Sequence, residues 1–189
     1  GYETSNGQGA IIMKYYSIFL FIIILPTWMS AQEHKEVQWL DLDEAMELQR
    51  EEPRKLFIDV YTDWCGWCKR MDKTTFQDTA IVKMLNEEFY PVKFDAESAH
   101  PVRFAGKVYK NPNPDARRST HQLTAAMLGR KISYPSYAFY NENYRRITVV
   151  KGYVKPENLM PVLHYIGKGI YQNQEWQEFL TEWEKDTKQ

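Results

Sequence analysis

Cys65 and Cys68 are the only cysteines of the 189-residue chain, and two residues separate them. In disulfide exchange the attacking group is a thiolate, so a reactive cysteine needs a pKa lowered from about 8.5 toward neutrality. The first turn of a helix lowers a thiol pKa, because its unpaired N–H groups and its dipole favour negative charge. At a helix start, Cys65 would attack a substrate disulfide, and Cys68, one turn further on, would resolve the mixed disulfide. A C-x-x-C pair at a strand-to-helix junction therefore predicts redox chemistry.

Two other uses of the pair stay open on the sequence alone. A purely structural disulfide that closes a loop of about four residues adds only about 2 kcal/mol to the free energy of unfolding, less than a wider spacing supplies. A zinc site needs four ligands, and no H-x3–5-H pair accompanies the two thiolates. We favour a redox pair over both and expect neither a metal nor a bound cofactor. The histidines are scattered: His34, His100, His121 and His164.

The segment before the pair has the pattern of a buried strand. Lys55–Tyr61 is a short apolar run of β-branched and aromatic residues, and it holds one carboxylate, Asp59. Thr62 and Asp63 then lead into the cysteines and the following helix. The pair is therefore expected at the end of a central strand, six residues after a buried acid.

The rest of the chain alternates between helical and extended patterns, which predicts an α/β sheet with helices on both faces. Apolar spacing and capping residues predict the helices, and short apolar runs bounded by turn residues predict the strands. The further helices are expected at 41–50, 79–88, 120–128, around 159–166 and at about 171–185, and the further strands at 90–95, 134–140 and 146–150.

The segment 96–119, between the middle strand and the following helix, is less regular. Val102–Phe104 and Lys107–Tyr109 flank Ala105-Gly106, which predicts a small hairpin. The segment is basic, and it either contacts substrate or forms a solvated loop. Its cations are Arg103, Lys107, Lys110, Arg117 and Arg118.

The motif Trp64-Cys65-Gly66-Trp67-Cys68-Lys69 resembles the active site of the thioredoxin superfamily, with Trp67 where thioredoxin has proline. Asp59 has the spacing of the family's buried acid, Pro135 falls where the family has a cis-proline, and Gly152 matches a glycine after the final hairpin. The chain is most similar in this motif to exported bacterial thioredoxin-like proteins. The resemblance covers about 37–167 and implies a thioredoxin fold, with a central mixed sheet, the insertion at 96–119 and an extra C-terminal helix.

The resemblance also implies roles for individual residues. Cys65 and Cys68 would reduce or isomerise protein disulfides, and Asp59, with a pKa raised by burial, would take the proton of Cys68. A cis bond between Tyr134 and Pro135 would leave the Tyr134 backbone free to pair with an extended substrate chain. Asp59 could instead pair locally, and Trp64 could be partly buried. Substrate contacts are otherwise expected at Trp64, Gly66 and Trp67.

The N-terminal region has the pattern of a secretory signal peptide. Lys14 precedes the apolar run Ile18–Leu25, and small and polar residues follow, so residues 13–31 are interpreted as a signal that is cleaved after Ala31. A retained membrane anchor is the less favoured interpretation, because the run is shorter than the roughly 20 residues of a membrane span. Residues 1–12 are interpreted as upstream sequence, and 32–189 as a single domain in the periplasm or outside the cell.

Composition narrows the class of partner. The formal net charge is −1, whereas a nucleic-acid-binding protein normally carries a basic excess, so we expect no nucleic-acid partner. Apolar residues make up 43% of the chain, which is enough for one packed core and excludes a disordered chain. The expected partners are proteins with disulfides and, for a reductase outside the cytoplasm, a membrane electron donor. A thiol oxidant, or a non-catalytic binding module with a static disulfide, is the alternative.

Overall fold

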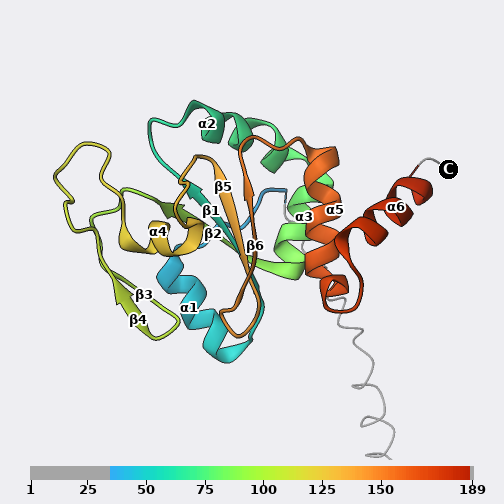
Figure 1. The fold of residues 1–189 in the computed structure, drawn as a ribbon, viewed down its shortest axis with the longest axis horizontal. Helices are drawn as coiled ribbons and strands as arrows, with labels where there is room; N and C mark the ends of the chain where they lie inside the picture. The colour runs from blue at the N-terminus through green and yellow to red at the C-terminus, as the bar shows by residue number, and fades with distance from the viewer. Residues whose placement is uncertain (1–34, 188–189) are drawn as a thin grey trace, which may run out of the picture. The chain divides into compact units, whose positions relative to one another are not determined.

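The computed structural model describes residues 35–187, and the predicted signal peptide at 13–31 lies outside this part of the chain. The described residues form a mixed α/β structure (Figure 1). Its α-helices are α1 (Leu42–Glu51), α2 (Gly66–Lys73), α3 (Thr79–Glu88), α4 (Gln122–Leu128), α5 (Pro156–Gly167) and α6 (Trp176–Asp186). Its strands are β1 (Lys55–Tyr61), β2 (Phe89–Asp95), β3 (Val102–Phe104), β4 (Lys107–Tyr109), β5 (Ser136–Tyr140) and β6 (Arg146–Lys151).

Local sequence signals account for where the first helices begin. Asp41 caps α1 in a capping box, in which its side chain accepts the Glu44 N–H and the Glu44 side chain accepts the Asp41 N–H. Asp78 caps α3 by accepting the N–H groups of Ala80 and Ile81. These helix starts agree with the sequence prediction, because each depends on residues within one turn.

The main sheet has four strands in the order β2-β1-β5-β6. β1 pairs with β2 in parallel and with β5 antiparallel, and β5 pairs with β6 antiparallel. The predicted central position of Lys55–Tyr61 is therefore confirmed. Helices cover both faces of this sheet, as Figure 1 shows. The sheet is the scaffold on which the end of β1 presents the cysteine pair.

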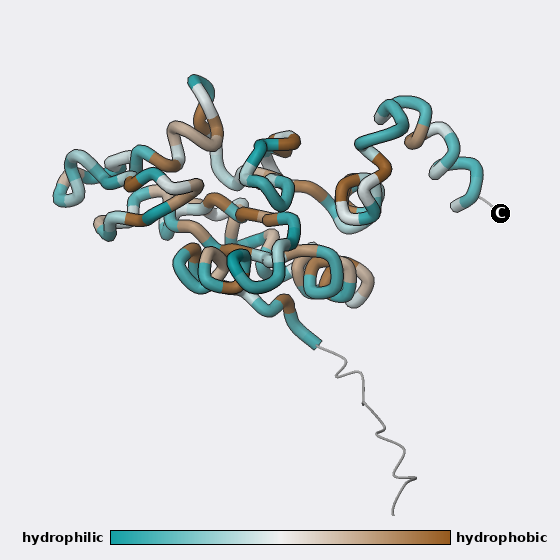
Figure 2. Tube along the Cα trace, turned by 90° about the horizontal axis from the view of Figure 1, so that it is seen from below, coloured by the Kyte–Doolittle hydropathy of each residue, from teal (hydrophilic) through white to brown (hydrophobic). Residues whose placement is uncertain are grey.

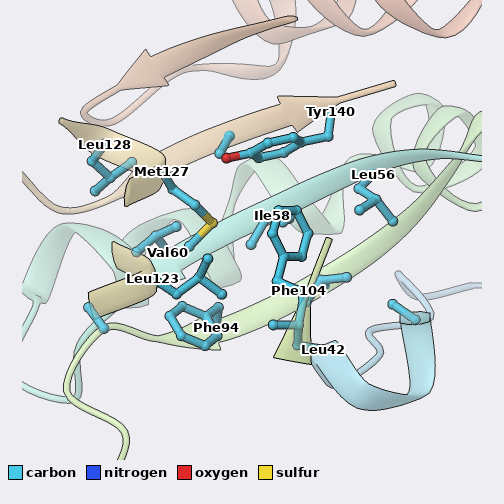
Figure 3. Close-up of a cluster of buried hydrophobic side chains, with 14 of the residues drawn as sticks. Leu42, Leu56, Ile58, Val60, Phe94, Phe104, Leu123, Met127, Leu128 and Tyr140 are labelled. Atoms are coloured by element: carbon cyan, nitrogen blue, oxygen red, sulfur yellow. The ribbon is translucent and has the colours of Figure 1, made fainter. Parts of the chain in front are cut away.

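Alternate residues of β1 point into two separate cores. Leu56, Ile58 and Val60 pack with residues of α1 and α4 on one face (Figure 3). Phe57 packs on the other face with Met71 of α2 and with residues of α3 and α5. Asp59 follows Phe57 at the spacing of two, so its carboxylate belongs to the face that α2 covers.

The insertion at 96–119 contains the predicted hairpin, β3 paired antiparallel with β4. Phe104 of β3 is buried in the core that also holds Ile58 and Leu42 (Figure 3). Its ring lies edge-on to Tyr140 and Tyr144, with ring centroids 5.0 and 5.7 Å apart. The hairpin is thus fastened to the domain by an aromatic side chain.

The C-terminal helix α6 is present and begins at Trp176, later than the expected start near 171. Residues Ile170–Gln172 form a separate 3-10 turn, η3, after Gly169 adopts a left-handed conformation with φ of 73°. Phe179 faces His164 and Tyr165 of α5, while the outer turns of α6 are hydrophilic in Figure 2. Among the described residues, no helix has both the length and the apolar character that a membrane crossing requires.

Candidate active site

The two cysteines form a disulfide at the start of α2. Cys65 is the N-cap residue of this helix, and its sulfur accepts the backbone N–H of Cys68 at 3.1 Å. The first turn of α2 contains no acidic residue, so its positive helix end acts on Cys65 without opposition from a carboxylate on that turn. The helix start predicted from the sequence is therefore where the structure places the pair. This position stabilises a negative charge on Cys65 once the disulfide is reduced.

Two tryptophans flank the buried disulfide. Trp64 and Trp67 are 49% and 55% exposed, whereas Cys65 is 5% exposed. The Trp67 ring packs against Tyr153, with ring centroids 5.6 Å apart. An added Cβ at Gly66 would meet nothing within 4 Å, so the residue between them leaves open space. The three residues therefore form an accessible, partly apolar rim beside Cys65.

Tyr134 and Pro135 form the facing side of this rim. The Tyr134–Pro135 peptide bond is cis, as the resemblance to the thioredoxin superfamily implies. The Tyr134 ring lies edge-on to Trp64, with centroids 5.8 Å apart, so the loop before β5 rests on the active-site motif. The Pro135 carbonyl accepts the Gly152 N–H at 2.8 Å, whereas the Tyr134 N–H and C=O have no hydrogen-bond partner within residues 35–187. The Tyr134 N–H and C=O are thus available for hydrogen bonds with another chain.

Asp59 is buried, with 1% of its surface exposed. Its Oδ2 accepts a hydrogen bond from Lys93 Nζ of β2 at 2.7 Å. Burial raises the pKa of Asp59 to about 6, and the neighbouring Lys93 ammonium opposes this rise. The acid expected from the sequence is therefore both buried and paired. It titrates close to neutral pH.

Lys93 also bonds a second carboxylate, Asp72 Oδ1 of α2, at 2.5 Å. Asp72 follows Cys68 by four residues, so the two share one face of α2. Burial alone would lower the pKa of Lys93, but the carboxylates of Asp59 and Asp72 raise it above its ordinary value. Lys93 thus links Asp59 of β1 to Asp72 of α2, on the helix face that also carries Cys68.

Sequence reasoning missed both Lys93 and Asp72. Lys93 is the one cation in the largely apolar strand Phe89–Asp95, and parallel pairing puts it in register with Asp59. A basic residue at that strand position was a usable signal. The sequence around Asp72 contains no such signal, because the contact of Asp72 with Lys93 depends on how α2 crosses the sheet.

Three buried polar atoms near the pair have no hydrogen-bond partner within the described part of the chain: Asp59 Oδ1, Thr62 Oγ1 and the Tyr137 hydroxyl. Tyr137 of β5 is the register partner of Asp59, so both side chains lie on the same sheet face. Burial raises the pKa of Tyr137 above its ordinary value, so the phenol stays neutral. Asp59 Oδ1 is therefore a free acceptor in a largely apolar environment.

Two other kinds of candidate site within residues 35–187 are metal-binding clusters and pockets that could hold a ligand. No group of three or more His, Cys, Asp or Glu side chains there could hold a metal ion. A groove of about 460 Å³ lies between β6, α5 and the start of α6, away from the cysteines. Its lining includes Ile147, Val162 and Trp176 and holds no thiol or carboxylate. The cysteine pair is thus the candidate active site.

Comparison with known proteins agrees with the fold. The thioredoxin of Thermus thermophilus superimposes with a TM-score of 0.51 at 14% identity, covering 69% of this chain and 87% of that one. A thioredoxin-fold protein from Helicobacter pylori gives a TM-score of 0.54 at 13% identity, with 80% and 89% covered. A protein from Bacteroides thetaiotaomicron, described as a proposed disulphide-isomerase, gives 0.50 at 24% identity, with 76% and 98% covered.

Sequence relatives match shorter stretches. Human spermatogenesis-associated protein 20 is 36% identical over 66 residues, which are 35% of this chain and 8% of the human protein. An uncharacterised protein of Caenorhabditis elegans is 33% identical over 59 residues, again 8% of its length. The chain therefore corresponds to a small part of these relatives. The model of the thioredoxin-like domain family matches residues 42–167, two thirds of the chain, and the protein belongs to that family.

Proposed function

We propose that the protein is a thiol–disulfide oxidoreductase that reduces or isomerises protein disulfides through Cys65 and Cys68. The observation that carries the proposal is the position of Cys65 at the N-cap of α2, with its sulfur accepting the Cys68 N–H. The same N–H would stabilise the Cys65 thiolate after reduction. Membership of the thioredoxin-like family supports this use of the pair.

The exchange proceeds in two balanced steps. The Cys65 thiolate attacks one sulfur of a substrate disulfide, forms a mixed disulfide and releases the other substrate sulfur as a thiolate, which is then protonated. Cys68 loses its proton and attacks Cys65, which releases the second substrate thiol and leaves the Cys65–Cys68 disulfide. Two electrons pass from the protein pair to the substrate. The oxidised product of this cycle is the state in which the two cysteines are bonded here.

Asp59 is the base of the second step in this proposal. A carboxyl with a pKa of about 6 is largely ionised at neutral pH and still accepts a proton readily. Its unpaired Oδ1 gives the proton a place to go, directly or through a water molecule. Lys93 would hold Asp59 in position on its other oxygen.

The substrate would bind as an extended chain. The unpaired Tyr134 backbone offers one N–H and one C=O beside the cis-proline, and backbone pairing of this kind accepts many sequences. Trp64 and Trp67 would add apolar contact on either side of Cys65, across the open space at Gly66. This mode suits flexible or unfolded polypeptides with disulfides.

The direction of electron flow that we propose is from the protein to the substrate. The oxidised pair must then be reduced again by an external dithiol, and for an exported protein this donor would be a membrane protein. A thiol oxidant would run the same steps in reverse. Titration of the pair against glutathione buffers, together with assays of insulin reduction and of dithiol oxidation, distinguishes the two directions.

We also propose that the protein acts outside the cytoplasm, with residues 13–31 as an export signal. Its apolar run and its single leading cation support the proposal. Expression of the full chain in a bacterial host, followed by cell fractionation and N-terminal sequencing, tests it. A mature N-terminus near Gln32 in the periplasmic fraction is the expected result, and a cytoplasmic protein that keeps residues 13–31 would contradict it.

The opposing hypothesis is a binding module with a static disulfide. A reduction potential well below about −300 mV, with no turnover of insulin, would favour that module over the enzyme. Cys68→Ser should accumulate mixed disulfides with substrate proteins, whereas Cys65→Ser should form none and have no activity. Failure of Cys68→Ser to trap any disulfide substrate would remove its resolving role.

A further inference from the structure

The insertion at 96–119 carries an excess of positive charge. It contains five cations against two carboxylates, a net charge of +3, whereas the whole chain carries −1, so the rest of the chain carries −4. The cations are exposed, and none of them forms an ion pair with any residue of the described chain. They are Arg103, Lys107, Lys110, Arg117 and Arg118.

The insertion is held in a defined position against the domain. Phe104 fastens its hairpin to the core. Asn111, which is 6% exposed, closes the loop behind the hairpin by donating to the Glu97 carbonyl at 3.1 Å and to Ser119 Oγ at 2.7 Å. The His121 N–H bonds the Ala96 carbonyl at 2.8 Å, which ties the two ends of the insertion together. These contacts position the loop that carries Arg117 and Arg118.

Arg118 reaches the active-site motif from this loop. Its guanidinium carbon lies 4.7 Å from the centroid of the Trp64 ring, the residue directly before Cys65. Trp64 Nε1 donates to Glu97 Oε2 at 3.0 Å, so Glu97 is engaged at the ring edge and makes no ion pair with Arg118. Arg118 has a positive φ of 58°, a backbone conformation that arginine seldom adopts without surrounding contacts.

A second arginine lies on the other side of the cysteine pair. Arg70 of α2 places its guanidinium carbon 5.5 Å from the Trp67 ring centroid and 5.4 Å from that of Tyr153. It forms no ion pair within residues 35–187 either. Each exposed tryptophan beside Cys65 therefore has a guanidinium group over its ring. An aromatic ring beneath a guanidinium orients it without neutralising its charge.

We propose that Arg118 and the basic insertion around it form a docking surface for acidic polypeptide segments that flank the target disulfide. A carboxylate in such a segment would bond the guanidinium edge of Arg118 while the neighbouring chain lies along Trp64 and Tyr134. The excess of +3 on the insertion would raise the encounter rate with acidic partners, and salt would weaken the effect. This inference rests on the proposed function and adds the class of substrate.

The test uses three synthetic peptides that share one disulfide loop and differ only in flanking residues: glutamate, glutamine or lysine. The full-length protein reduces each peptide with a small dithiol as the electron donor, and kcat/KM is measured at low ionic strength and at about 0.15 M. The variants are Arg118→Gln and Arg118→Glu. Lys83→Gln, an exposed charge on α3, is the matched control. Thermal unfolding of each variant shows that it is folded.

The expected result is that the wild-type protein prefers the glutamate peptide over the lysine peptide by at least about threefold at low salt. Arg118→Gln should reduce this ratio, Arg118→Glu should reverse it, and Lys83→Gln should leave it unchanged. Equal ratios in the wild type and in Arg118→Gln would overturn the proposal, as would the absence of any preference in the wild type.

A second arm separates this proposal from the proposed function. Calorimetry measures binding of the same peptides with a thioether in place of the disulfide, which cannot be reduced. Tighter binding of the glutamate peptide that is lost in Arg118→Glu supports the docking surface, even if no peptide is reduced and the enzymatic function fails. Reduction of all peptides at equal rates, with equal binding, keeps the enzyme and rejects the docking surface.

Discussion

Lys93 joins the buried Asp59 to the surface: its ammonium lies 2.7 Å from Asp59 Oδ2 and 2.5 Å from Asp72 Oδ1. The Asp59 side chain is 2% exposed, whereas that of Asp72 is 44% exposed. Burial still outweighs the attraction of Lys93, so the pKa of Asp59 is raised to about 6. The ion pair therefore tunes an acid that the proposed exchange uses as its base.

Replacement of that cation should change the pH dependence of the second exchange step. In Lys93→Met the pKa of Asp59 rises further above about 6, because burial remains and the opposing charge is gone. The midpoint of the rate–pH profile for release of substrate from the Cys65 mixed disulfide should move upward by about one unit or more. Stopped-flow fluorescence measures this release. A midpoint that stays unchanged, with Lys83→Met as control, would remove Lys93 from the mechanism.

Asp59 should also make stability depend on pH. Its folded-state pKa of about 6 lies above the ordinary value of 3.8, so the folded protein favours the protonated form. The contribution of this group is fully present below about pH 3.8 and is lost as the pH rises through about 6, up to about 3 kcal/mol in all. The difference in unfolding free energy between Asp59→Asn and the wild type should therefore grow in favour of the variant over this window. Urea unfolding of the oxidised proteins at several pH values measures it, and parallel curves would contradict it.

Gly167 should not tolerate a side chain. A Cβ at this last residue of α5 would lie 3.0 Å from Glu88 Cβ and 3.1 Å from a ring carbon of the buried Phe89. Gly167→Ala should lower the free energy of unfolding by about 1–3 kcal/mol, because the end of α3 must move. Chemical denaturation measures the change. Gly66→Ala, which meets nothing within 4 Å, is the control, and an equal effect of both changes would argue against the close packing of α3 and α5.

Phe104 should hold the insertion against the domain. Phe104→Ala removes a ring that is 4% exposed and should cost about 3–5 kcal/mol of unfolding free energy. Relative to the wild type, amide hydrogen exchange should accelerate more in 102–119 than in β1, because the hairpin loses its contact with the core first. Val108→Ala, in the same hairpin but 52% exposed, should change stability by less than about 0.5 kcal/mol. An equal acceleration in the two regions would show that other contacts position the insertion.

Much of the fold followed from the sequence because its signals are local. The capping box of Asp41 and Glu44 set the start of α1, and the apolar run Lys55–Tyr61 matched β1 at both ends. The start of α6 was the weaker prediction, since the η3 turn at Ile170–Gln172 occupies the expected start near 171 and α6 begins only at Trp176. Boundaries that depend on one backbone conformation are poorly encoded in apolar spacing.

The sequence by itself determined the spacing of the cysteine pair, its place at a helix start and the acid in the preceding strand, because each depends on residues close together in the chain. The cis-proline was implied by the resemblance to the thioredoxin superfamily. Tertiary structure alone decided that Lys93 donates hydrogen bonds to both Asp59 and Asp72. It also decided that the Arg118 guanidinium lies over the Trp64 ring. Strand register brings Lys93 to Asp59 across 34 residues. The anchoring of the insertion brings Arg118 to the rim. Such contacts depend on how elements pack against one another, which no local pattern records.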